Sequence, residues 1–276
     1  MTIGIVMANR NYARWINDAI QSIYDQSHQD WLLYVMDYGS TDGSISTIQA
    51  WEATSGGRVK LYAPGNPKIA TSVALTEIAR QADAGGKGIY PLKAHNVALR
   101  LFKGNKNITH VLKFDPDDIL LDGVLAEMFQ AFKSRTRLVF SDFQLANQSG
   151  SAVGAVPDLT GWYEKAPEEC LIPEVHIIRR DALDALNCWE YNWADYGALA
   201  VWERILRIVS EYGPEAIHHH RRYIRHDKPP RAGWLYRQHS DQLSQTMMVK
   251  QWQVERDRVS AEYWSRVEGH GGLVRE

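Results

Sequence analysis

The sequence has few cysteines, and this argues against two classes of protein. Cys170 and Cys188 are the only two among 276 residues, which is too few for a disulfide framework. Their spacing also differs from that of a cysteine metal site. We therefore expect a protein of a reducing compartment, with both thiols as core filler.

An excess of charge and a long apolar run are absent as well. The 31 basic and 33 acidic side chains give a formal charge of -2, so no global field attracts nucleic acid or an anionic membrane. No apolar stretch approaches the roughly 18 residues of a membrane span. The first residues carry no basic leader. These features predict a soluble, cytoplasmic protein.

What is present begins with an alternation of strand-like and helix-like runs. Apolar runs at 3–8, 31–36 and 58–62 are typical of buried parallel strands, and helical spacing fills the segments between them. The βαβαβ order predicts an α/β fold with a mostly parallel, Rossmann-like sheet flanked by helices. Ligands of such sheets bind outside the carboxyl ends of the strands, where Asn9, Asp37 and Asp115 fall. No Gly-x-Gly-x-x-Gly follows a strand, which argues against a dinucleotide oxidoreductase.

The run from Val111 to Leu120 carries the strongest chemical signal. An apolar strand stops at Asp115, Asp117 and Asp118, and Pro116 prevents the strand from continuing. Carboxylates this close repel one another unless a cation lies among them. Mg²⁺ and Mn²⁺ prefer such oxygen ligands and complete their coordination with water and phosphate. The run therefore predicts a divalent-metal site, and the alternative is an acidic turn that caps the next helix.

The rest of the chain predicts further elements on both sides of this run. Helical spacing extends over 69–84, 92–102, 125–132 and 196–209, with strands at 138–145 and 174–179. Residues 148–161 are polar and small, as in a mobile loop near a site. Two short strands flank the basic stretch 218–231, and a last helix spans 249–267. Arg237, or Arg225 and Lys228 of the basic stretch, would act as a charge clamp over a leaving diphosphate, and the alternative is a solvated strand.

These segments resemble the GT-A fold glycosyltransferases, specifically the inverting group called family 2. The patterns that carry the resemblance occur in the family's order and are Asn9-Arg10-Asn11, Val35-Met36-Asp37-Tyr38-Gly39-Ser40-Thr41-Asp42-Gly43-Ser44, Phe114-Asp115-Pro116-Asp117-Asp118, Arg179-Arg180-Asp181 with Trp193-Ala194-Asp195-Tyr196, and Tyr236-Arg237-Gln238-His239. They extend over about residues 3–245. The resemblance implies an enzyme that transfers a sugar from a nucleotide-diphosphate donor, with UDP as the expected nucleotide, to an acceptor hydroxyl.

The resemblance also implies roles for individual residues. Asn9, Asn11 and Asp37 would contact the base and ribose of the donor. Asp115 would contact ribose or metal, and Asp117 would ligate Mn²⁺ or Mg²⁺ with His239 as a further ligand. Asp195 would be the catalytic base. The remaining residues of the predicted donor-binding set are Ala8, Lys93, Asn96 and Arg237.

Departures from the family pattern leave some alternatives open. Tyr38 replaces the second carboxylate of the usual pair, and His95 stands where the family often has Arg. Ala194 replaces the usual Glu before the base, which leaves Glu190 as a rival base. From spacing alone, a helix cap is the favoured interpretation of Asp195, and Asp37 likewise fits a helix-capping turn. A nucleotidyltransferase of similar fold, or a catalytically silent nucleotide-sugar-binding module, are the alternative functions.

The domain organisation follows from the same patterns. We expect a GT-A domain over residues 1–245, with a nucleotide-binding half at 1–118 and an acceptor half at 119–245. Residues 246–276 would form a helical extension. The acceptor is open among a glycan, a lipid-linked carrier, a protein and a nucleic acid.

Overall fold

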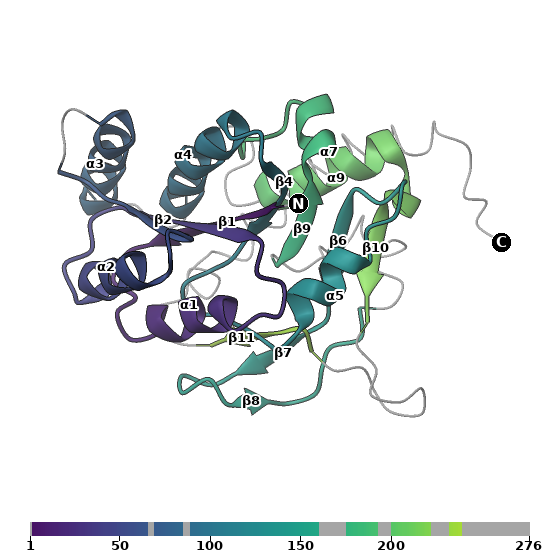
Figure 1. Ribbon diagram of the computed structural model, residues 1–276, viewed down its shortest axis with the longest axis horizontal. Helices are drawn as coiled ribbons and strands as arrows, with labels where there is room; N and C mark the ends of the chain where they lie inside the picture. The colour runs from purple at the N-terminus through teal and green to yellow at the C-terminus, as the bar shows by residue number, and fades with distance from the viewer. Residues whose placement is uncertain are drawn as a thin grey trace.

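A computed structural model of the chain describes most of its residues in two sheets and the helices around them (Figure 1). The described ranges are 2–65, 69–84, 89–159, 175–192, 200–221 and 232–238. The predicted helix at 249–267 and most of the basic stretch 218–231 lie outside these ranges.

The larger sheet has seven strands in the order β10-β6-β9-β4-β1-β2-β3. Every neighbouring pair is parallel except those that β9 forms with β4 and β6. The mostly parallel sheet predicted from the βαβαβ order is therefore confirmed. In chain order the strands are β1 (Thr2–Asn9), β2 (Trp31–Asp37), β3 (Val59–Tyr62), β4 (Ile108–Lys113), β6 (Leu138–Ser141), β9 (His176–Arg179) and β10 (Ile217–His220).

Helices cover both faces of this sheet because alternate strand side chains point to opposite faces. On β1, Ile5 and Met7 pack with α1 (Ile16–Tyr24), α2 (Ser44–Thr54) and α5 (Val124–Gln130). Val6 and Ala8 pack on the other face, with four helices that lie above the strands in Figure 1. These helices are α3 (Ala70–Asp83), α4 (Tyr90–Gly104), α7 (Arg180–Ala185) and α9 (Ala200–Tyr212).

A smaller sheet, which the sequence did not predict, has the order β5-β11-β7-β8. The strand expected at 138–145 divides at Asp142, where β6 of the large sheet ends and β7 of the small sheet begins. The Asp142 carbonyl accepts a hydrogen bond from Gly233 N at 2.7 Å, which holds the break in place. The strands are β5 (Ile119–Leu120), β7 (Phe143–Ala146), β8 (Ala152–Val153) and β11 (Trp234–Arg237).

Several boundaries differ from those expected. The segment 148–161, expected to be a loop throughout, contains β8, which pairs antiparallel with β7. The helix expected at 196–209 is described as α9 from residue 200 to 212, followed by a short 3₁₀ turn, η2 (Pro214–Ala216). The two strands expected around the basic stretch are present as β10 and β11. Among the described helices, none combines the length and apolarity that crossing a membrane requires.

His110 on β4 is a buried titratable group of the core. Its Nδ1 lies 2.9 Å from Thr109 Oγ1, and its ring packs edge-on against Phe129 and Phe132. Burial, together with the charge of Arg179, lowers the pKa of His110 to about 4. Because the unfolded chain then binds this proton more tightly than the folded chain, the contribution of His110 to stability is lost as pH falls from 6.5 toward 4.

We expect His110→Phe to reduce this acid sensitivity, since phenylalanine keeps the aromatic packing and cannot be protonated. The variant should retain up to about 3 kcal/mol more of its unfolding free energy than the wild type between neutral pH and pH 4. Denaturant unfolding at a series of pH values measures this, with His28→Phe, at a partly exposed histidine that also packs against Phe129, as control. Parallel pH profiles for His110→Phe and wild type would contradict the expectation.

Candidate functional site

The carboxyl ends of β1, β2 and β4 meet at one edge of the large sheet. β1 lies between the other two, and its last residue, Asn9, is the register partner of Asp37, the last residue of β2. On the other side, Val6 is the partner of Lys113, so the acidic run 115–118 follows beside the end of β1. The polar residues predicted to bind the donor therefore reach this edge from neighbouring strands.

Asn9 and Asp37 form one buried hydrogen-bonded unit. Asn9 Nδ2 donates to Asp37 Oδ2 at 2.7 Å and to Ser40 Oγ at 3.1 Å. Asp37 Oδ1 accepts from the backbone N–H groups of Gly39 and Ser40 at 3.0 and 2.9 Å, in a turn where Gly39 has a φ of 99°. Asn9 Oδ1 is buried without a hydrogen-bond partner. The Asn9 Oδ1 is therefore a hydrogen-bond acceptor whose orientation is fixed by the bonds of the same amide group.

Asn11 joins the loops that follow β1 and β2. It adopts a left-handed φ of 62°, which asparagine tolerates better than most residues. Its Oδ1 accepts from Thr41 N at 2.7 Å, and Ser40 Oγ accepts from Asn11 N at 2.9 Å. The side chain of Asn11 thus fixes the loop geometry around Asn9 and Asp37.

Helix α4 brings three residues of the predicted region to the other side of β1. His95 Nε2 accepts from Ala8 N at 3.1 Å, so the neutral ring carries its proton on Nδ1. Asn96 exchanges two hydrogen bonds with the backbone of Tyr191, at 2.9 and 2.7 Å. Lys93 Nζ donates to Gln81 Oε1 of α3 at 2.7 Å. Asn96 therefore holds in place the segment that leads toward Asp195.

A buried lysine just before the acidic run forms an ion pair with it. Lys113, whose side chain is 5% exposed, contacts Asp115 Oδ2 at 2.8 Å. Asp117 and Asp118 are buried. Burial raises the pKa of Asp118 well above its usual range, and the charges of Asp117 and Asp115 raise it further. Such crowding is relieved by a cation, as expected for a metal site.

Arg237 anchors this run from the small sheet. Its backbone N–H donates to Asp118 Oδ1 at 3.2 Å, and its Nε donates to the Asp117 carbonyl at 2.7 Å. The rest of the guanidinium contacts the Gln148 carbonyl at 2.7 Å and Asp18 Oδ2 at 3.3 Å. Arg237 is buried, so the interpretation of a solvated strand is wrong for this residue.

Tyr12 and Lys113 belong to the site and were not predicted from the sequence, whereas Gln148 begins the loop 148–161 that was expected near it. Burial raises the pKa of the Tyr12 hydroxyl, and the charges of Asp117 and Asp115 raise it further, which places Tyr12 close to the acidic run. The Gln148 carbonyl accepts hydrogen bonds from both Trp15 Nε1 and Arg237. The position of Tyr12 directly after Asn11 was the one available signal in the sequence.

The predicted base and one predicted metal ligand lie outside the described residues, namely Asp195 and His239. The rival base, Glu190, is described, and its carboxylate contacts Arg100 on α4 at 2.5 Å with the side chain 44% exposed. Within the described ranges, no group of three His, Cys, Asp or Glu side chains is arranged to hold a metal. The oxygen donors of Asp115 and Asp117 nevertheless suit Mg²⁺ or Mn²⁺, since Mg²⁺ usually takes one or two carboxylates from a protein.

A mostly parallel sheet with helices on both faces and an acidic run at its carboxyl edge is the arrangement of the GT-A fold. The structure resembles residues 1–349 of TarS from S. aureus, solved in complex with UDP-GlcNAc, with a TM-score of 0.55 and 13% identity over 98% of this chain and 73% of that chain. It also resembles glucosyl-3-phosphoglycerate synthase from Mycobacterium tuberculosis in complex with UDP, with a TM-score of 0.50 and 17% identity over 96% of this chain and 80% of that chain. The chain therefore has the GT-A fold.

The sequence comparisons cover less of the molecule. No protein-family model matches the chain. A curated protein of Nostoc sp., named as the uncharacterized glycosyltransferase alr2836, is 35% identical over 60 residues. The matched stretch is 22% of this chain and 19% of that protein, about a fifth of either.

Proposed function

We propose that the protein is an inverting glycosyltransferase that moves a sugar from a nucleotide-diphosphate donor, with UDP as nucleotide, to an acceptor hydroxyl. The observation that carries the proposal is the meeting of the Asn9–Asp37 unit and the acidic run at one edge of a GT-A sheet. The sequence relative named as a glycosyltransferase and the structural likeness to UDP-bound proteins support it.

The donor nucleoside would be held by the loops after β1 and β2. A uracil base offers one N–H and two carbonyl groups, and the unpartnered Asn9 Oδ1 would accept from such an N–H. Because the Asn9 amide is fixed by Asp37 and Ser40, it cannot rotate to present its NH₂ group instead. Asp115, which is partly exposed and oriented by Lys113, is positioned for a ribose hydroxyl.

Asp117 would hold Mn²⁺ or Mg²⁺, with His239 as a proposed further ligand. When bound there, such an ion supplies Lewis-acid neutralisation of the leaving diphosphate without proton transfer. Arg237 keeps the acidic run in place through its bonds to Asp117 and Asp118, so the carboxylates need little reorganisation when the donor binds.

The acceptor hydroxyl requires a base, because a neutral hydroxyl is a poor nucleophile. We assign this role to Asp195, which would take the proton while the hydroxyl oxygen attacks the anomeric carbon opposite the leaving diphosphate. The Asn96–Tyr191 bonds hold the segment four residues before Asp195 against α4. We propose that this attachment sets the approach of the base. Glu190 is the rival, and its contact with Arg100 occupies one carboxylate oxygen.

A donor screen with the purified chain tests this function. Nucleotide-diphosphate sugars would be offered with Mn²⁺ or Mg²⁺ and with glycan, lipid-linked, protein and nucleic-acid acceptors, and release of nucleotide diphosphate would be read. We expect release from at least one UDP-sugar and inversion at the anomeric carbon of the product. If no donor binds or turns over, or if pyrophosphate is released instead, the proposal fails.

A further inference from the structure

Arg204 on α9 is a buried cation without a carboxylate partner among the described residues. Only 2% of it is exposed. One terminal nitrogen donates to the Trp189 carbonyl at 2.8 Å, and the guanidinium carbon lies 3.7 Å from the centroid of the Tyr191 ring. Arg204 Nε is buried and has no hydrogen-bond partner. A buried charge is costly unless it is paired, so this arrangement needs an explanation.

The nearest acidic side chain in the sequence does not supply the pair. Glu203, the preceding residue, is buried and binds Arg207 one helical turn further along α9. The two arginines of α9 thus differ in both pairing and exposure. Arg207 has a carboxylate partner and is partly exposed, whereas Arg204 is enclosed with a ring and a backbone carbonyl.

A second unsatisfied donor also packs near the Tyr191 ring. His95 uses Nε2 to accept from Ala8 N, and its Nδ1–H is fully buried without a partner. The His95 and Tyr191 rings are 6.2 Å apart between centroids. Burial lowers the pKa of His95 well below its usual value, and the nearby charges of Lys113 and Arg204 lower it further.

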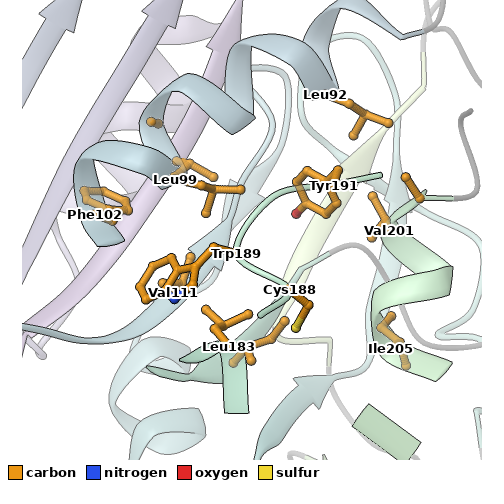
Figure 2. Packing of buried hydrophobic residues seen from close by; sticks show 14 of the residues in the cluster. Leu92, Leu99, Phe102, Val111, Leu183, Cys188, Trp189, Tyr191, Val201 and Ile205 are labelled. Atoms are coloured by element: carbon orange, nitrogen blue, oxygen red, sulfur yellow. The ribbon is translucent and has the colours of Figure 1, made fainter. Parts of the chain in front are cut away.

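These donors come from two helices that meet at Tyr191. Figure 2 shows the Tyr191 ring near Leu92 of α4 and Val201 of α9. The backbone of Tyr191 is fixed by Asn96, and its ring packs against both His95 and Arg204. His95 in turn accepts a hydrogen bond from Ala8, the residue before Asn9, which places the His95 donor next to the end of β1 where the donor-binding residues lie.

We propose that Arg204 and the Nδ1–H of His95 bind an anionic group, a phosphate or carboxylate that one of the two substrates carries. A guanidinium fork matches two oxygens of such a group, and the imidazole N–H supplies a third hydrogen bond. The positive field of Lys113 adds to the attraction. The assignment of the anion to a substrate rests on the proposed function, whereas anion binding itself does not.

The test compares Arg204→Met, Arg204→Lys and wild type in the full chain, with Arg207→Met as the matched control. Thermal melting would be followed during titration with inorganic phosphate, UDP-glucose and UDP-glucuronate. We expect phosphate to stabilise the wild type, and to bind about ten- to a hundred-fold more weakly to Arg204→Met. Without ligand, Arg204→Met should melt at or above the wild-type temperature, because a buried charge without a carboxylate partner is removed. Arg207→Met should melt lower, because the buried Glu203 loses its ion pair with Arg207.

The two nucleotide sugars identify the source of the anion. A preference for UDP-glucuronate that Arg204→Met abolishes assigns the carboxylate to the donor sugar. Equal affinity for both sugars, with phosphate binding still dependent on Arg204, assigns the anion to the acceptor. If Arg204→Met does not fold, Arg204→Lys should bind phosphate several-fold more weakly, since it lacks the fork.

Phosphate affinity that is unchanged in the Arg204 variants, or a wild type that responds to none of the three probes, would overturn the proposal. The result is separable from the proposed function. Nucleotide sugars that bind and turn over in a protein whose phosphate affinity does not depend on Arg204 overturn this inference alone. Phosphate that binds through Arg204 in a protein that turns over no nucleotide sugar overturns the proposed function alone.

Discussion

Asp117→Ala is expected to remove metal binding and donor binding together. The metal's main partner on the donor is the diphosphate, so loss of the ligand removes the contact that holds both. We expect at least about a 100-fold fall in kcat/KM, together with loss of the metal-dependent part of UDP affinity. Calorimetric titration of UDP with Mn²⁺, with Mg²⁺ and with chelator measures the second effect directly.

The exposed Asp122→Ala is the control, because it removes a carboxylate a few positions along the same segment. It should leave both quantities within about two-fold of wild type. The metal assignment is wrong if chelator leaves the turnover of the wild type intact, or if Asp117→Ala binds UDP with unchanged metal dependence.

The second large effect is expected at the base. Asp195→Asn should lower turnover by about 10²- to 10⁴-fold, since the amide cannot accept the acceptor's proton. UDP affinity should be retained, because the nucleotide contacts are assigned to other residues. Single-turnover kinetics with a saturating donor separates the two quantities.

Glu190→Gln provides the matched comparison, since it makes the same chemical change at the rival base. Its carboxylate is partly exposed and already contacts Arg100, an arrangement typical of a surface ion pair of small energetic effect. We expect turnover within a few-fold of wild type. The reverse pattern, with Glu190→Gln inactive and Asp195→Asn active, would move the catalytic role to Glu190.

The strands that carry the nucleotide half could be predicted because their signals are local. Each of β1, β2 and β4 is a short apolar run that ends in a polar residue, and the alternation with helices fixes their parallel order. The register of Asn9 against Asp37 then follows from the topology. For this reason the edge at which the predicted donor-binding residues lie was available from sequence.

The small sheet could not be predicted because its contacts join residues that are far apart in the sequence. Arg237 binds the Asp117 carbonyl 120 residues away, and no local pattern around either residue indicates the pair. The run 138–145 reads as one strand, since its break at Asp142 depends on the distant Gly233. Lys113 was overlooked for a different reason, because a lysine at a strand end usually indicates solvent.

The buried polar groups around Tyr191 show a similar limit. Arg204 and Glu203 occur in an amphipathic helical pattern whose charged positions are usually solvated, yet both are buried. The burial of Arg204 depends on how α9 packs against the segment 189–191, which Asn96 of α4 holds and which sequence periodicity does not specify. The unpartnered donors of His95 and Arg204 become visible only once those elements are in contact.

The most direct test of the central claim is a crystal structure of the protein with UDP and Mn²⁺. The account predicts the nucleoside against Asn9 and Asp37, and the diphosphate with its metal beside Asp117. Nucleotide bound elsewhere on the sheet, or a metal that does not contact the acidic run 115–118, would contradict it.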